Sequence, residues 1–112
     1  MPEVAYLVRV NDLVIYHNGD YRAAYEEDYR YLRTITDHID VAFLIGHPFP
    51  DHQHFRQAMR LSELFRIGTI FPMNREGEPQ RCRDYARLLA ERGATAAIHV
   101  AGRRGEVFTL AP

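Results

Sequence analysis

The chain opens with two short runs that have the composition of strands and then changes to a helical period. Residues 4–10 and 13–17 are rich in β-branched and aromatic side chains, and Asn11-Asp12 between them suits a tight turn. We therefore predict an antiparallel hairpin. Beyond it, apolar residues recur at steps of three and four, which predicts a helix with one apolar face. That face consists of Tyr25, Tyr29, Leu32, Ile35 and Ile39.

Strand and helix patterns alternate through the middle of the chain. Val41 to Ile45 is apolar without interruption, as in a strand buried on both faces. A second helical stripe covers residues 55–65 and is expected to stop near Gly68. Thr69 to Phe71 then predicts a short strand before a proline.

A third helix and a second hairpin are predicted to complete the chain. Pro79 suits the first turn of this helix, and Arg92-Gly93 is a typical closing signal. Residues 96–100 and 106–110, separated by Gly102-Arg103-Arg104-Gly105, are expected to pair as a terminal hairpin. The inward residues of the third helix would be Cys82, Tyr85, Ala86 and Leu89.

This order of elements predicts an α/β domain with a mixed sheet and a surface that needs covering. The first strand carries Tyr6, Val8 and Val10 on one face and Leu7 on the other. If the three helices all lie on the same side of the sheet, its other face requires a partner layer. We therefore expect the domain to associate with itself or with another domain.

Length and composition place these elements in a single domain spanning residues 1–112. The formal net charge of −1 and the absence of a segment that combines arginines with stacking aromatics argue against nucleic acid as a partner. Cys82 is the only cysteine, so no intrachain disulfide forms, which fits a cytoplasmic location. No run approaches the 18 or so apolar residues of a membrane span, so no membrane partner is expected.

Three short motifs resemble the C-terminal half of a metallo-β-lactamase-fold protein. The first hairpin ends in Tyr16-His17-Asn18-Gly19-Asp20, which resembles the strand and turn written His-x-Gly-Asp in that family. Asp40 to His47 is similar to the buried strand and glycine loop that follow there, and Pro72-Met73-Asn74 stands where the family has Pro-Met-His. The stretch from Ile98 to Leu110 is similar to the last strands of the lactonase-like branch. The resemblance implies half of an αββα sandwich.

The resemblance also implies a metal site of which this chain supplies only a part. In the family, the aspartate that matches Asp20 binds a pair of metal ions, and the loop that matches Asn74 and Arg75 contacts substrate. The main metal motif, His-x-His-x-Asp-His, belongs to the N-terminal half. Asn74 replaces a histidine, and an amide oxygen is a weak zinc ligand. Zinc is therefore possible as a cofactor but is expected to be absent from the isolated chain.

The candidate ligands also have ordinary structural interpretations. Asp20 follows a glycine at a strand end, where an aspartate often caps the next helix instead of binding metal. The segment from His47 to His54 holds three histidines and one aspartate, and either forms a local site or serves as a polar loop in which Asp51 caps a helix. His47 is its best candidate for a ligand that lines a cleft.

Three functions remain open at this point. The first is a hydrolase half or fragment, in which metal-dependent hydrolysis of an ester, lactone or phosphodiester requires completion by an N-terminal half. The second is a non-catalytic interaction or binding module that dimerises through its exposed sheet face. The third is an unrelated small α/β domain that binds a ligand.

Overall fold

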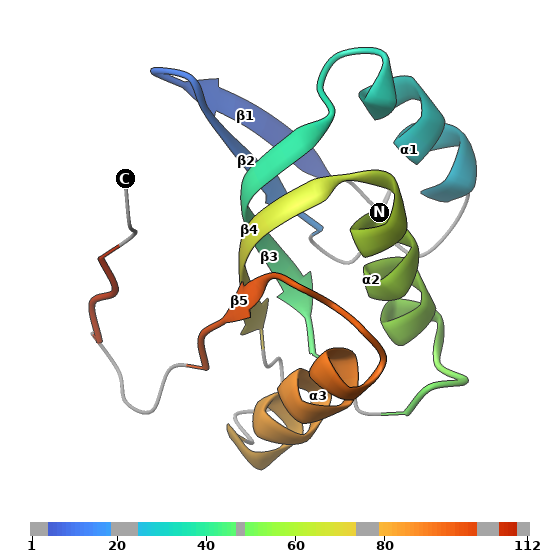
Figure 1. The fold of residues 1–112 in the computed structure, drawn as a ribbon, viewed down its shortest axis with the longest axis vertical. Helices are drawn as coiled ribbons and strands as arrows, with labels where there is room; N and C mark the ends of the chain where they lie inside the picture. Colours follow the sequence, from blue (N-terminus) through green and yellow to red (C-terminus); the bar gives the residue numbers. More distant parts are fainter. Residues whose placement is uncertain (1–4, 19–24, 47–48, 74–78, 101–105, 110–112) are drawn as a thin grey trace.

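Five strands form one mixed sheet, and three helices lie against one of its faces (Figure 1). These features come from a computed structural model that describes residues 5–18, 25–46, 49–73, 79–100 and 106–109. The strand order across the sheet is the order along the chain, β1-β2-β3-β4-β5. The elements are β1 (Tyr6–Val10), β2 (Leu13–His17), α1 (Tyr25–Arg33), β3 (His38–Ile45), α2 (Gln53–Leu64), β4 (Arg66–Met73), α3 (Pro79–Glu91) and β5 (Ala97–Ile98).

The predicted N-terminal hairpin is confirmed. Strands β1 and β2 pair antiparallel, and the last pair before the turn is Val10 with Leu13. Asn11 and Asp12 have positive φ angles of 48° and 68°. This left-handed backbone matches the right-handed twist of two strands joined by a two-residue turn, and Asn and Asp tolerate it better than most residues.

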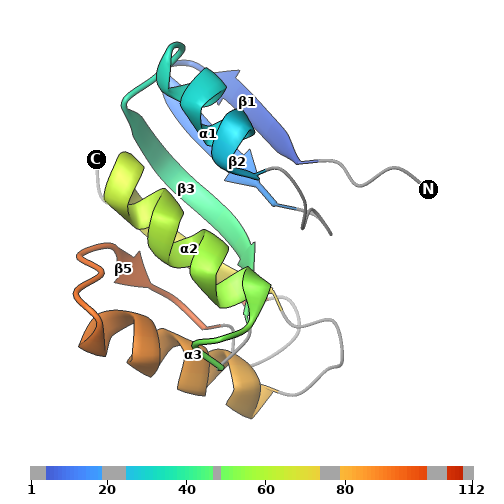
Figure 2. The same ribbon diagram turned by 90° about the vertical axis from the view of Figure 1, so that its right-hand side faces the viewer.

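The strands from β2 to β5 are parallel, and each is joined to the next by a helix. Both views show α1, α2 and α3 on the same side of the sheet (Figures 1 and 2). The condition under which we predicted an uncovered face is therefore met. The described C-terminal segment, residues 106–109, lies on the opposite side from the helices (Figure 1).

A hydrophobic core fills the space between the helices and the sheet. The third helix contributes the inward residues that its period predicted, since Cys82, Tyr85 and Leu89 are buried. Burial of each large side chain contributes roughly 1.5–3 kcal/mol, so this one layer supplies most of the favourable free energy of folding. The largest buried apolar side chains are Tyr16, Tyr29, Tyr85, Phe55, Ile39, Leu44, Leu61, Ile70, Leu89 and Val14.

The first helix is shorter than its apolar stripe suggested, and that prediction was wrong at its C-terminal end. Helix α1 stops at Arg33, Ile35 is 45% exposed, and Ile39 lies within β3. The hydroxyl of Thr34 donates a hydrogen bond to the carbonyl of Tyr31 at 2.6 Å. Such side-chain bonds compete with the helical ladder and favour a helix end at β-branched polar residues.

Gly68 does not end the second helix as predicted, because it lies inside β4. The chain leaves α2 at Phe65, whose backbone is already extended (φ −127°, ψ 148°). A Cβ atom at Gly68 would lie 2.9 Å from the backbone oxygen of Asp40 on β3. Glycine is therefore needed here because two backbones approach closely, and not because a helix ends.

Of the two strands predicted for the C-terminal hairpin, the structure shows only the first. Strand β5, Ala97–Ile98, is two residues long and pairs parallel with β4. Within the described residues, the segment 106–109 forms no strand. Its Phe108 ring instead packs against Phe71 on the open face of the sheet, at 5.2 Å between ring centroids.

We expect Gly68→Ala to destabilise the fold by about 1–3 kcal/mol, because the added methyl group must separate β3 and β4 at Asp40. Urea unfolding followed by circular dichroism measures this change. Thr95→Ala, at an exposed position, is the control and should change the free energy of unfolding by less than about 0.5 kcal/mol. Equal stability of Gly68→Ala and the unmodified chain would show that this close approach is not required.

Candidate functional site

The carboxyl ends of three parallel strands meet at one edge of the sheet. Backbone hydrogen bonds tie them together, from the Asn18 amide to the Phe43 carbonyl at 3.0 Å and from the Gly46 amide to the Met73 carbonyl at 2.9 Å. In open α/β sheets, ligands bind outside the carboxyl ends of the strands. This edge, at the ends of β2, β3 and β4, is therefore the candidate position of a functional site.

All four residues that the sequence analysis assigned to a site lie outside the described residues. They are Asp20, His47, Asn74 and Arg75. The described residues that precede these segments are Asn18, Gly46 and Met73, at the ends of β2, β3 and β4. The structure thus brings together the three strand ends that directly precede the predicted ligands. The position of the ligands themselves stays a prediction.

Two amide side chains are buried just below this edge. Asn18 is 2% exposed and Gln57, on α2, is fully buried. The Asn18 Nδ2 atom donates to Gln57 Oε1 at 3.3 Å. Among the described residues, Asn18 Oδ1 and Gln57 Nε2 have no hydrogen-bond partner. A buried amide atom without a partner costs about 1–3 kcal/mol, so this pair calls for an explanation beyond packing.

The histidine-rich segment before α2 acts as a helix cap in its described part. His52 is the N-cap, and its Nδ1 atom accepts a hydrogen bond from the backbone amide of His54 at 3.1 Å. The prediction that Asp51 caps this helix was therefore wrong, and Asp51 is exposed. The rings of His52 and His54 stack at 5.0 Å between centroids, with His54 buried and His52 half-buried.

No group of three His, Cys, Asp or Glu side chains in the described part of the chain is placed to hold a metal ion. A zinc site needs about three protein ligands. The described residues alone therefore do not fit zinc. Cys82 is no substitute, because burial raises the pKa of its thiol and keeps it protonated.

A row of rings crosses the open face of the sheet from β1 to the segment after β5. The register pairs Tyr6 with His17, His17 with Phe43, and Phe43 with Phe71. Their ring centroids are 6.5, 5.9 and 5.5 Å apart, and Phe43 and Phe71 are stacked. His99 follows at 5.7 Å from Phe71. We call these five residues the ring row.

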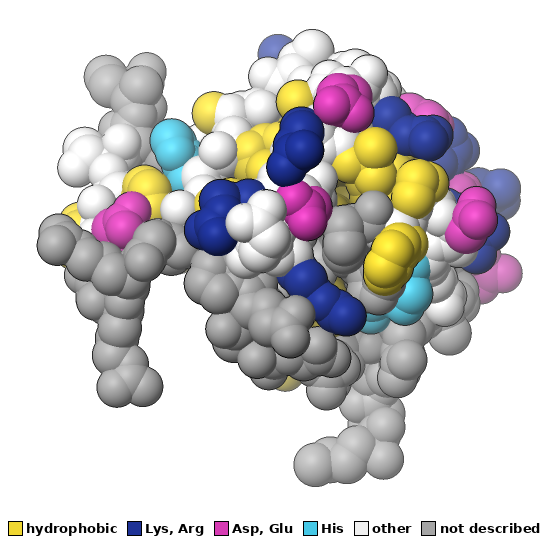
Figure 3. Space-filling model, turned by 90° about the horizontal axis from the view of Figure 1, so that it is seen from below, with side chains coloured by type: hydrophobic (Ala, Val, Ile, Leu, Met, Phe, Trp, Pro, Cys, Tyr) yellow, Lys and Arg dark blue, Asp and Glu magenta, His cyan; other side chains and the backbone are white. Residues whose placement is uncertain are grey.

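A groove of about 520 Å³ lies between this face and the C-terminal segment. In Figure 3, hydrophobic side chains, a histidine and an acidic residue lie at the left of the molecule, and side chains of the same kinds lie among the arginines at the centre and right. Glu106 is the one carboxylate among the described residues that line the groove. The groove is lined by Leu13, Ile15, Val41, Phe43, Phe71, Pro72, Met73, His99, Glu106 and Phe108.

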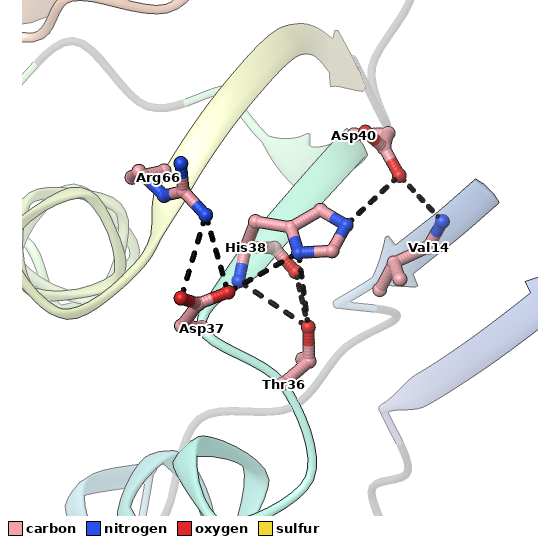
Figure 4. Close-up of polar contacts among 6 residues, drawn as sticks. All are labelled: Val14, Thr36, Asp37, His38, Asp40 and Arg66. Carbon is pink, nitrogen blue, oxygen red and sulfur yellow. Dashed lines mark hydrogen bonds and ion pairs between the residues drawn. The ribbon is translucent and has the colours of Figure 1, made fainter. Parts of the chain in front are cut away.

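A polar cluster ties the strands together at the opposite end of the sheet (Figure 4). Asp40 Oδ2 accepts a hydrogen bond from the Val14 amide of β2 at 2.7 Å and lies 3.5 Å from His38 Nε2. The other ring nitrogen of His38 lies 3.3 Å from Asp37 Oδ1. Hydrogen bonds from His38 and Arg66, together with the charge of Arg66, lower the pKa of Asp37.

Three core tyrosines are held in their neutral form. Burial raises the pKa of Tyr16 to about 12 and also raises the pKa values of Tyr29 and Tyr85. Tyr16 and Tyr29 pack edge to face at 6.2 Å. These hydroxyls are therefore structural, and none of the three is placed to act as an acid or base near neutral pH.

Comparison with known proteins adds no family to this picture. No family model, no curated protein and no solved structure matches the chain. The metallo-β-lactamase resemblance therefore stays a prediction from its short motifs. Among the helices that the structure describes, none is long and apolar enough to cross a membrane.

The sequence analysis missed the ring row and the buried amide pair. The ring row needs the register between strands, which alternation within one strand does not give. The amide pair had a visible signal, because Gln57 lies three residues after His54 and four before Leu61, within an otherwise apolar helical stripe. A glutamine in such a stripe indicates a buried polar contact.

The polar cluster predicts a specific dependence of stability on acid. Because the folded-state pKa of Asp37 is lowered, its stabilising effect is complete above the ordinary pKa of about 4 and is lost as pH falls below it. Asp37→Asn should reduce stability at pH 7 and flatten the stability curve below about pH 4. Urea unfolding from pH 2.5 to 7 tests this, with Asp51→Asn as the exposed control. Parallel curves for Asp37→Asn and the unmodified chain would contradict the assignment.

Proposed function

We propose that this chain is one half of a metallo-β-lactamase-like αββα sandwich, whose open sheet face packs on a second sheet. The observation that carries the proposal is the combination of three helices on one face with the ring row on the other. Packed sheets lie about 10 Å apart with interleaved apolar side chains. A face with this composition suits the inner layer of such a sandwich.

The second sheet belongs either to an N-terminal half or to a second copy of this chain. In the first case, the association completes a metal site and permits metal-dependent hydrolysis. Asp20 and His47 would then contribute ligands, and Asn74 and Arg75 would lie in the loop that contacts substrate. The adjacent ends of β2, β3 and β4 support this arrangement, because all three segments leave the sheet at one edge.

A non-catalytic interaction module is the alternative function. One observation favours it for the chain by itself: Asn74 stands where the family has a histidine. Under this alternative, the chain keeps the sandwich architecture and uses its open face for dimerisation. The two functions share the sheet interface and differ in metal binding.

Restoring the missing histidine separates these two functions. We expect the unmodified chain to retain far less than one zinc ion per chain after desalting, and Asn74→His to increase zinc affinity by about tenfold or more. Elemental analysis and competition with a zinc chelator measure the change. The gain should disappear in the double variant Asn74→His with Asp20→Ala.

Gln80→His, on the exposed surface of α3, is the matched control for an added histidine. If Asn74→His binds no more zinc than Gln80→His does, the metal-site part of the proposal is wrong and the interaction module remains. Zinc binding by Asn74→His that persists without Asp20 would also contradict the proposed site.

A further inference from the structure

The C-terminal segment lies on the open face of the sheet through one aromatic side chain. Phe108 contacts Phe71 edge to face at 5.2 Å and His99 at 5.1 Å between ring centroids. Its neighbour Val107 is 85% exposed, and Glu106 lines the groove beneath the segment. The groove separates much of this segment from the sheet.

The position of Phe108 conflicts with sheet-on-sheet packing. Two packed sheets are about 10 Å apart, and side chains from both sheets fill the space between them. The Phe108 ring lies against the Phe71 ring on this face, at 5.2 Å between ring centroids, where side chains of a second sheet would have to pack. Phe108 and a second sheet therefore compete for the same surface above Phe71.

We propose that a second copy of this chain covers the open face, and that the segment 106–109 is a built-in competitor which association displaces. The inference deepens the proposed function, because it uses the same sheet face and names its partner. Phe108 shields Phe71 and His99 in the single chain, and the partner's ring row takes its place in the dimer.

The exposed area and the charge of the face favour a second copy as its occupant. A stable interface buries about 800 Å² per partner, and an aromatic side chain has an area of about 150–250 Å². On β1, Tyr6 is 57% exposed, and Val8 and Val10 are 47% and 50% exposed. The other four residues of the ring row are half-buried. These residues form an exposed apolar patch on the open face. Because it carries no charge apart from Glu106 among its described residues, two copies can meet without repulsion.

Sedimentation equilibrium of the full chain tests the inference with one releasing variant and one blocking variant. Phe108→Ala should tighten dimerisation by about tenfold, because the competing ring contact is removed. Val8→Glu, which places a charge on the open face, should abolish the dimer at the same concentrations. Arg9→Glu adds an acidic residue to the other face of β1 and should leave the dimer intact.

Weaker dimerisation of Phe108→Ala would show that Phe108 belongs to the dimer interface. An unchanged dimer dissociation constant would show that Phe108 does not compete with the second copy. Either result overturns the inference. Monomers at all concentrations for both the unmodified chain and Phe108→Ala would rule out the second copy as partner. These outcomes are independent of zinc binding by Asn74→His, so failure of the metal-site proposal is distinguished from failure of this one.

Discussion

Handedness of the strand connections is the constraint from which the rest of the structure follows. A helix that joins two neighbouring parallel strands nearly always makes a right-handed crossover. In this chain, β2 to β5 are laid down in one direction across the sheet, so each crossover places its helix on the same face. A doubly wound sheet reverses direction once and covers both faces. Without that reversal, one face stays open.

Register then determines what the open face presents. Because side chains alternate along a strand, a shift of one residue in β3 would turn Phe43 toward the helices and bring Ala42 to the open face. The observed register instead aligns His17, Phe43 and Phe71 in one row. Their ring centroids lie 5.9 and 5.5 Å apart, close to the spacing of neighbouring strands. The aromatic contacts and the backbone ladder therefore stabilise the same register.

The sequence predicted elements well where one local signal dominates, and less well where a tertiary contact decides. The Asn11-Asp12 turn and the inward face of α3 were predicted correctly, because each depends on local backbone preference or on helical period. Gly68 was misinterpreted because its reason is a backbone 28 residues away, at Asp40. Ile39 fits a helical stripe in spacing, but the hydrogen bonds of β3 override that pattern. For the candidate site, the motifs predict a position at the carboxyl ends of β2, β3 and β4, and that position stays a prediction. The ring row depends on register between strands and was not predictable from any one segment.

The two ends of the sheet differ in the polar contacts that hold them. At the amino end of β3, Asp40 accepts the amide of Val14, and His38 lies between two carboxylates, so the cluster holds β2 against β3. At the carboxyl end, the buried amides of Asn18 and Gln57 keep one atom each without a partner among the described residues. A protein tolerates such a cost where geometry serves something other than stability, and satisfies its polar groups where it does not. The buried amide pair thus lies at the same edge of the sheet as the strand ends that precede Asp20, His47 and Asn74, and the motifs and the buried amides are independent observations.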